Sequence, residues 1–328
     1  MIRKVLVTGG AGYIGSHMTR LLVERNYEVK VFDNLSTGHS ESLPSSVEFI
    51  QGDLKDLDAV ERLFSKRDID AVMHFAAHSL VGESMENPLK YYTNNLIGGL
   101  NLLNAMKKYD VDIFVFSSTA AVYGEPETVP ITEDFPLMPT NHYGKSKLMF
   151  ENILDSCIKY GIKSACLRYF NAAGAGFGIG EDHNPETHLI PITLKVALGK
   201  IEKINIFGDD YDTSDGTCIR DYVHVLDLAE AHILALRKLE KAEEGCSFKY
   251  NLGSEKGYSV KEVVNTARDV TGHAIPANIS KRRPGDPAKL VASFEKAKKE
   301  LGWEPKFNLA DIISSAWEWH KNNPNGFC

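Results

Sequence analysis

The chain has 328 residues, of which 43% are hydrophobic, and a formal net charge of −7. This length suits one large or two ordinary domains, and the acidic balance argues against a nucleic-acid or membrane-surface binder. No apolar run approaches the ~20 residues of a membrane span. A core strand follows the first three residues, so we expect no signal peptide and a cytoplasmic location.

Cysteine and histidine usage gives no sign of disulfides or metal. The five cysteines are odd in number, scattered and free of C-x-x-C, which is typical of reduced thiols in a cytosolic protein. The eleven histidines form no H-E-x-x-H or comparable cluster, so we predict no bound metal.

Strand and helix signals alternate through the first half of the chain. The expected strands are Lys4–Thr8, Glu28–Asp33, Val47–Ile50, Ala71–Phe75, Asp112–Ser117 and Lys163–Tyr169. The expected helices are Tyr13–Arg25, Leu57–Lys66, Pro88–Tyr109 and Tyr143–Tyr160. Strands separated by helices imply crossover connections, and therefore an α/β fold with a doubly wound parallel (Rossmann) sheet.

The second half predicts a smaller α/β domain for substrate. Its expected elements are helix Pro191–Leu198, strand Ile204–Phe207, helix Val223–Leu239, strand Phe248–Leu252, and helices Val260–Thr271, Phe294–Leu301 and Leu309–Lys321. A Gly- and Pro-rich loop precedes them, from Ala172 to Ile190. We place a dinucleotide domain at 1–175, with a return of the chain around 223–252, and a substrate domain at 176–328.

A glycine-rich turn between the first strand and helix predicts dinucleotide binding. Gly10, Gly12 and Gly15 satisfy G-x-G-x-x-G, and Gly9 gives the variant G-x-x-G-x-x-G. The turn lets the backbone approach a pyrophosphate, which meets the free N–H groups of the helix start. Asp33 ends the next strand, where a carboxylate binds a ribose diol and favours NAD over NADP. The alternative is a glycine-rich turn that holds no ligand.

Small and polar residues also occur at the ends of the other strands: Gln51–Leu54, His74–Ala77, Ser117–Thr119 and Tyr169–Gly174. Such residues often simply end strands. Ligands of a doubly wound sheet, however, lie beyond the carboxyl ends of its strands. Several such ends on one edge predict a cofactor cleft.

Tyr143 and Lys147 lie four residues apart on one face of a predicted helix. A phenol with a pKa near 10 is a poor base at pH 7, and a pKa of ~6–7 requires about 4–5 kcal/mol of preferential phenolate stabilisation. A lysine ammonium and an oxidised nicotinamide ring together provide such charge. We predict Tyr143 as the base and Lys147 as its partner, with Thr119 hydrogen-bonding the reacting hydroxyl.

These features together resemble the extended short-chain dehydrogenase/reductase superfamily and, within it, the family of UDP-glucose 4-epimerases (UDP-galactose 4-epimerases). The resemblance runs nearly end to end. Its motifs are Gly9-x-x-Gly12-x-x-Gly15, His74–Ala77, Val81–Ser84, Asn94–Asn95, Ser117–Thr119, Ala121–Gly124, Tyr143-x-x-x-Lys147, Tyr169–Asn171, Gly216–Val225 and Arg282–Asp286.

The resemblance implies permanently held NAD⁺, a UDP-hexose substrate and a homodimer. The expected cofactor-binding residues are Gly9, Gly12, Tyr13, Ile14, Gly15, Asp33, Asn34, Ser36, Thr37, Gly38, Asp53, Leu54, Phe75, Ala76, Ala77, Ser79, Asn94, Ser117, Tyr143, Lys147, Tyr169 and Phe170. The expected substrate-binding residues are Ser79, Thr119, Tyr143, Asn171, His188, Leu189, Asn205, Ile206, Phe207, Arg220, Arg283, Asp286 and Leu290. Guanidinium groups such as those of Arg220 and Arg283 match diphosphate oxygens, although loop arginines are by default surface ion pairs.

Four positions depart from the best-known bacterial pattern of this family. Ser79 stands where some members carry Lys, Thr119 replaces Ser, and His188 stands where Asn is common. Leu290 occupies the position that borders the sugar C2 substituent, where Tyr tends to exclude N-acetyl groups. Because Leu is smaller than Tyr, we predict that N-acetylated UDP-sugars are accepted as well.

Two alternatives remain at this point. One is another nucleotide-sugar enzyme of the same superfamily, such as a dehydratase or a uronate epimerase or decarboxylase. Ala120 and Ala121 argue against a 4,6-dehydratase because they replace the acid pair that such an enzyme needs. The other is a non-catalytic NAD-sensing protein, which would have no need of Tyr143 and Lys147.

Overall fold

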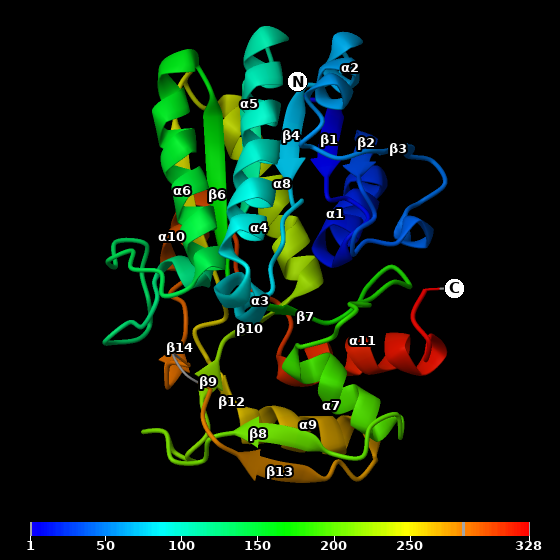
Figure 1. The fold of residues 1–328 in the computed structure, drawn as a ribbon, viewed down its shortest axis with the longest axis vertical. Helices are drawn as coiled ribbons and strands as arrows, with labels where there is room; N and C mark the ends of the chain where they lie inside the picture. The colour runs from blue at the N-terminus through cyan, green and yellow to red at the C-terminus, as the bar shows by residue number, and fades with distance from the viewer. Residues whose placement is uncertain (1, 284–285, 328) are drawn as a thin grey trace.

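A seven-stranded parallel sheet forms the centre of the molecule (Figure 1). The computed structural model describes residues 2–283 and 286–327. The sheet order is β11–β6–β5–β4–β1–β2–β3, with every neighbouring pair parallel. The strands are β1 (Lys4–Thr8), β2 (Glu28–Asp33), β3 (Glu48–Gln51), β4 (Ala71–His74), β5 (Ile113–Thr119), β6 (Lys163–Tyr169) and β11 (Ser247–Leu252). The predicted doubly wound parallel sheet is confirmed.

Helices cover both faces of this sheet, because its strands carry apolar residues on both sides. In β1, Val5 and Val7 join one core and Leu6, between them, joins the other. The first core packs under α1 (Tyr13–Glu24), α8 (Val225–Lys241) and α10 (Glu295–Leu301). The second packs under α2 (Leu57–Ser65), α5 (Gly98–Lys108) and α6 (His142–Cys157).

The helix predicted over Pro88–Tyr109 is interrupted, and that prediction is wrong in this respect. It divides into α4 (Pro88–Tyr92), a π turn (Thr93–Ile97) and α5, with α3 (Val81–Glu86) before it. The π turn carries the buried Asn95, whose side chain accepts a hydrogen bond from the N–H of His78 and donates one to Ser146 Oγ. A wider turn inserted into a helix is common at functional sites, and here it ties α6 to the loop after β4.

A smaller lobe lies beyond the carboxyl ends of the central strands (Figure 1). It contains the pair β8 (Ile204–Phe207) and β13 (Ala277–Ser280), the three-stranded sheet β12 (Tyr258–Ser259), β9 (Ile219–Arg220) and β14 (Lys289–Leu290), and the helices α7 (Leu189–Ala197), α9 (Val260–Thr271) and α11 (Leu309–Asn322). Leu194, Val263 and Ile312 form part of its separate core. Short 3₁₀ turns occur at Ser40–Ser42, Ala120–Val122 and Ile158–Tyr160.

The chain crosses between the lobes on two short paired strands, β7 (Asn171–Ala173) and β10 (Tyr222–His224). The predicted helix Val223–Leu239 therefore begins two residues late, at Val225, because its first residues pair as β10. After the crossing, α8 and β11 belong to the central sheet and its cover. The domain boundaries at 175 and 176 stay a prediction, and so does the return around 223–252.

The cysteines that the structure describes, at positions 157, 166, 218 and 246, are unpaired, and Cys328 lies outside the described residues. Within residues 2–283 and 286–327, no helix has both the length and the apolar character that crossing a bilayer requires.

Candidate functional site

A cleft of about 1340 Å³ lies between the two lobes, at the carboxyl ends of the sheet. This volume exceeds the ~300–1,000 Å³ of a typical small-molecule site, so a dinucleotide and a second ligand fit together. The predicted cofactor and substrate residues line the cleft, except Gly38 and Ile206. Ile206 is buried, at 4% exposed, and Gly38 packs against the backbone of Ala11 and Gly12.

The glycine turn has the geometry that a pyrophosphate requires. Gly9 has a φ of +72°, and a Cβ added at Gly15 would lie 2.0 Å from the carbonyl oxygen of Gly9. Helix α1 starts after Gly12 with no side-chain cap and no acid in its first turn. Gly12, Tyr13 and Ile14 line the cleft, so the free N–H groups and the positive dipole end of α1 are open to it, and an anionic group fits there.

Asp33 lies at the end of β2, beside this turn. The backbone N–H groups of Ala11 and Leu35 donate to its two carboxylate oxygens at 2.9 and 2.8 Å. Burial raises the pKa of the Asp33 carboxyl, while these N–H groups act to lower it. They hold the carboxylate in the orientation that a ribose diol needs, so the adenosine end of NAD fits this position.

Tyr143 and Thr119 meet at the base of the cleft, where the start of α6 packs against the end of β5. Asn141 caps α6 by accepting from the N–H of Gly144 at 2.8 Å, which sets the start of the helix. Burial raises the pKa of Tyr143, and a hydrogen bond with Thr119 acts to lower it. A protonated phenol is therefore the resting form until further positive charge enters the cleft.

Lys147 lies one helical turn further along α6, with its side chain buried. Its Nζ donates to the carbonyl oxygen of Ser117 at 2.7 Å and lies 4.7 Å from the centre of the Phe116 ring. The Tyr143 ring centre is 6.0 Å from Nζ. Burial lowers the pKa of Lys147 to about 7. The predicted Tyr–Lys pair is thus brought together, and its lysine can change charge near neutral pH.

The small lobe contributes two arginines to the far end of the cleft. Arg220 pairs with Asp286 and donates to the Ile219 carbonyl at 2.8 Å. The Arg283 guanidinium lies 4.0 Å from the centre of the Phe207 ring. Both arginines line the cleft, so positive charge collects at this end. Pro284 and Gly285, inside the Arg282–Asp286 motif, lie outside the described residues.

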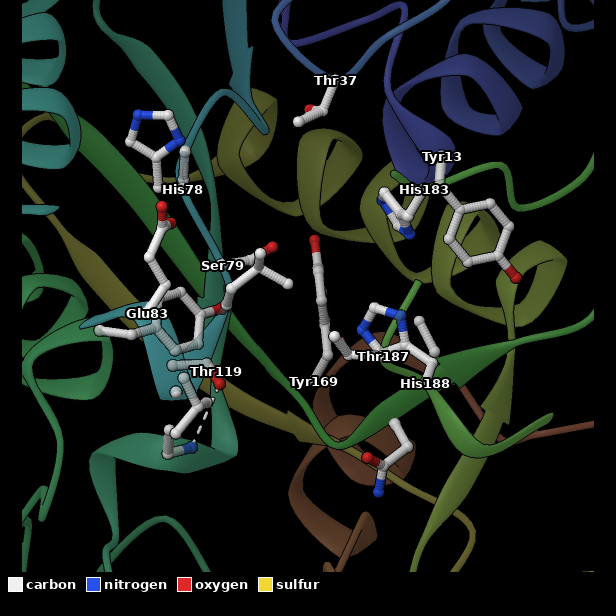
Figure 2. A pocket seen from close by; sticks show the side chains of 18 of the residues that line it. Tyr13, Thr37, His78, Ser79, Glu83, Thr119, Tyr169, His183, Thr187 and His188 are labelled. Atoms are coloured by element: carbon white, nitrogen blue, oxygen red, sulfur yellow. Dashed lines mark hydrogen bonds between the residues drawn. The ribbon is translucent and has the colours of Figure 1, made fainter. Parts of the chain in front are cut away.

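A loop between the lobes adds a cluster that the sequence did not predict. His183 and His188 face each other on the side of the cleft that carries Tyr13, opposite Ser79 and Thr119 (Figure 2). Nδ1 of His183 lies 2.9 Å from Glu181, and Nδ1 of His188 lies 2.8 Å from Glu181 and from Glu186. The four ligand atoms lie within 4.8 Å of one another. Ion pairs between the histidines and the glutamates explain why these atoms lie so close together. The absence of a bound metal stays a prediction.

Other cleft residues also escaped the sequence analysis. Glu83 and His78 line the side opposite His188 (Figure 2). The Glu83 carboxylate accepts from Lys90 at 2.5 Å and from Tyr91 at 2.8 Å, so it is held by the protein. The motif Val81–Ser84 could have indicated Glu83 as a cleft residue, but nothing in that motif assigned a role to it.

Comparisons with known proteins agree with this site. Residues 6–316 match a family model described as GDP-mannose 4,6 dehydratase. The UDP-glucose 4-epimerase of Halalkalibacterium halodurans is 55% identical, over 98% of this chain and 97% of that protein. A crystal structure of UDP-glucose 4-epimerase has a TM-score of 0.96 at 52% identity, covering 99% of this chain and 100% of that one. The Bifidobacterium longum enzyme in complex with NAD⁺ and UDP has a TM-score of 0.93 at 42% identity, over 99% and 100%.

The parallel sheet, the glycine turn and the paired Tyr143 and Lys147 define an enzyme of the extended short-chain dehydrogenase/reductase superfamily. The relatives most relevant here are UDP-glucose 4-epimerases at 51–55% identity, and they narrow the class from the superfamily to one family. The chain belongs to the UDP-glucose 4-epimerase family.

The first prediction concerns the charge of His188. Burial acts to lower its pKa, but hydrogen bonds to Glu181 and Glu186 outweigh burial and raise the pKa to about 10. We expect the NMR signal of the His188 ring, assigned with His188→Asn, to titrate far above the 6.5 of a free histidine. The stability that the raised pKa of His188 contributes is fully present below about pH 6.5 and is lost as the pH rises through about 10.

The variant Glu181→Gln removes one of the two carboxylates, so the titration of His188 should move toward lower pH. Glu202→Gln, which removes an exposed carboxylate of the small lobe, is the control and should leave the titration in place. A His188 signal that titrates near 6.5 in the parent protein would contradict the ion-paired geometry.

Proposed function

We propose that this protein interconverts UDP-glucose and UDP-galactose by epimerisation at C4, through a 4-keto sugar and with tightly bound NAD. The observation that carries the proposal is the cleft itself. It joins the glycine turn to Tyr143 and Lys147 at its base and to two arginines at its far end. The relatives support the same reaction, and one neighbour was crystallised with NAD⁺ and UDP.

In this proposal Tyr143 receives the proton of the sugar 4-hydroxyl and later returns it. Bound NAD⁺ supplies a reversible hydride acceptor and adds positive charge to the cleft. The Lys147 ammonium and that charge favour the phenolate of Tyr143, and Thr119 binds the reacting hydroxyl. Lys147 also holds the nicotinamide ribose.

The distribution of charge suits a sugar that must present both of its faces. The positive charges of Arg220, Arg283 and His188 bind the UDP diphosphate. Asn171 contacts a phosphate oxygen, and Asp286 binds the uridine ribose. The hexose end is bordered by Ala120, Ala121 and Leu290, which bind no hydroxyl group. A substrate held firmly by its nucleotide can turn about its pyrophosphate link there.

The structure gives a reason to prefer epimerisation to 4,6-dehydration, the activity named in the matching family model. A dehydratase needs an acid and a base beside C5 and C6, and Ala120 and Ala121 cannot transfer protons. Glu83 lines the cleft but is bound by Lys90 and Tyr91. A purely NAD-sensing protein would not need Tyr143 and Thr119 in contact.

The second prediction tests the reaction. Purified protein incubated with UDP-galactose, without added NAD⁺, should produce UDP-glucose, because the cofactor stays bound. Tyr143→Phe should reduce turnover by about 10²–10⁴-fold and keep the bound NAD⁺. Tyr92→Phe removes a phenol that hydrogen-bonds His142 and should keep full activity. A 4-keto-6-deoxy product, or full activity of Tyr143→Phe, would refute the assignment.

The third prediction concerns the sugar C2 substituent. Leu290 lines the cleft, the resemblance implies that it borders the sugar C2 substituent, and its side chain leaves more room than a tyrosine. We expect turnover of UDP-N-acetylglucosamine alongside UDP-glucose. Leu290→Tyr should slow the acetylated sugar at least about tenfold more than UDP-glucose, since the added ring fills the same space. No detectable turnover of UDP-N-acetylglucosamine by the parent protein would exclude this specificity.

The fourth prediction is a homodimer formed by α5 and α6. These helices approach closely where Gly99 meets Phe150. Beside that contact, Leu100 and Met149 are 40% and 45% exposed, and Leu89 on α4 is 75% exposed. Exposed apolar side chains on adjacent helices favour pairing with a second copy across a two-fold axis.

Light scattering at micromolar concentration should give twice the 36.4 kDa mass of one chain. Leu100→Lys with Met149→Lys should give a monomer. Ile279→Lys places the same charge on an exposed apolar position of β13, in the other lobe, and should leave the dimer intact. A monomeric parent protein would exclude this interface.

A further inference from the structure

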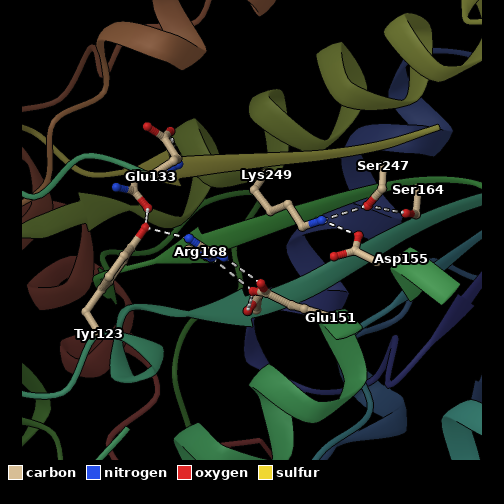
Figure 3. A network of polar contacts seen from close by, with 10 residues as sticks. Tyr123, Glu133, Glu151, Asp155, Ser164, Arg168, Ser247 and Lys249 are labelled. Carbon is tan, nitrogen blue, oxygen red and sulfur yellow. Dashed lines mark hydrogen bonds and ion pairs between the residues drawn. The ribbon is translucent and has the colours of Figure 1, made fainter. Parts of the chain in front are cut away.

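A row of buried polar side chains crosses three strands beneath α6 (Figure 3). Ser118 on β5, Arg168 on β6 and Asn251 on β11 are in register with one another, so their side chains lie on the same face of the sheet. All three are buried. The row begins immediately before Thr119 and runs away from the cleft.

Glu151 extends from α6 onto this row. Its side chain is 1% exposed. Its carboxylate accepts from Ser118 Oγ at 2.5 Å and from Arg168 Nε and Nη2 at 3.1 and 2.6 Å. The same carboxylate therefore holds neighbouring residues of β5 and β6.

The row continues through further hydrogen bonds to the segments that carry Ile131 and Ser293. Arg168 Nη1 donates to the Tyr123 hydroxyl at 2.7 Å, and that hydroxyl donates to Asn251 Oδ1 at 2.7 Å. Asn251 Nδ2 donates to the Ile131 carbonyl at 2.9 Å. The N–H of Ser293 donates to the same carbonyl. A connected set of polar groups thus joins the catalytic helix to the segment that follows Leu290.

Glu151 is also the next residue on the helix face that carries Tyr143 and Lys147, because the three are spaced by four. Burial lowers the pKa of Lys147, and the charge of Glu151 acts to raise it. The carboxylate thus opposes the loss of the Lys147 proton that burial favours.

Other titratable groups also face Lys147 from the elements packed around it. Burial raises the pKa of the Cys166 thiol on β6 and of the Tyr143 phenol, and it lowers the pKa of His74 on β4 to about 3. These three groups are therefore neutral at neutral pH. The Arg168 guanidinium carries a positive charge and is engaged by Glu151.

Fold stability alone does not account for a buried ion pair here. Desolvating two charges costs about as much as their attraction returns, and apolar residues of similar volume often replace such pairs without loss. Phe150 and Cys166, near this pair in the chain, belong to the apolar core beneath α6, where such replacements would pack. The pair is better explained by the positions and charges that it imposes on its neighbours.

We propose that Glu151 is a positioning residue for the reaction: its buried carboxylate holds the strand end that carries Thr119 and favours the ammonium form of Lys147. This inference rests on the proposed roles of Tyr143 and Lys147. It assigns no contact with substrate or cofactor to Glu151. Its effect reaches the substrate through Lys147 and Thr119.

The fifth prediction uses the double variant Glu151→Gln with Arg168→Met, which removes both charges and leaves no unpaired ion. Without the carboxylate, Lys147 should lose its proton at lower pH. In a plot of kcat against pH, the fall of kcat at high pH (the high-pH limb) should therefore occur about one pH unit lower than in the parent protein. Tyr143 should then ionise at higher pH, measured as tyrosinate absorbance of the purified protein with its bound cofactor, relative to Tyr143→Phe in the same background.

The matched control is Asp155→Asn with Lys249→Met. Asp155 lies one turn after Glu151 on α6 and pairs with Lys249 on β11 (Figure 3). Removal of this pair should leave the pH profile of kcat and the ionisation of Tyr143 unchanged. A double variant whose pH profile superimposes on that of the parent, even at a lower rate, would overturn the proposal.

Glu151→Asp provides a test if the double variant does not fold. Aspartate keeps the negative charge on a shorter side chain, so this variant should lower kcat without changing the pH at which kcat falls in the alkaline range. A limb that moves in Glu151→Asp would also overturn the proposal. A parent protein without epimerase activity refutes the proposed function instead, and the Tyr143 titration then still decides the role of Glu151.

Discussion

The ammonium group of Lys147 is buried beneath the cleft, and a buried charge is costly unless polar partners surround it. The Ser117 carbonyl accepts a hydrogen bond from it, and the face of the Phe116 ring attracts it through a cation–π contact. Both belong to β5, so α6 must pack against the end of that strand for the lysine to reach them. The same packing brings Tyr143 to Thr119. The burial of Lys147 therefore links the position of α6 to that of Thr119 at the end of β5.

The rest of the site follows from where the two lobes meet. Parallel strands end at one edge of the sheet, so the glycine turn, Asp33 and Thr119 open into the same cleft although they are far apart in the sequence. The chain then crosses on β7 and β10, and the small lobe carries its arginines to the opposite end. The end of the cleft that we propose for the nucleotide is consequently charged, and the end proposed for the hexose is bordered by Ala120, Ala121 and Leu290.

Much of this architecture was predictable from local patterns. The inner strands β1, β4, β5 and β6 are mostly apolar runs and almost wholly buried, and β1, β2 and β6 have the predicted ends. The π turn at Thr93–Ile97 was not predictable, because the contacts that Asn95 makes there, with His78 and Ser146, join residues 17 and 51 positions apart in the sequence. Strands of two to four residues, such as β9 and β14, have no periodicity to detect. The cluster from Glu181 to His188 lies in a loop, where spacing says little about proximity.

By itself, the sequence determined the doubly wound sheet, the dinucleotide turn and the pairing of Tyr143 with Lys147. Each of these depends on residues close together in the chain, where the periods of strands and helices decide which side chains share a face. Only the tertiary structure decided that Glu151 engages Ser118 and Arg168, and that His188 is ion-paired. Those contacts depend on strand register and on a loop that joins the lobes, and both are set by packing between distant segments.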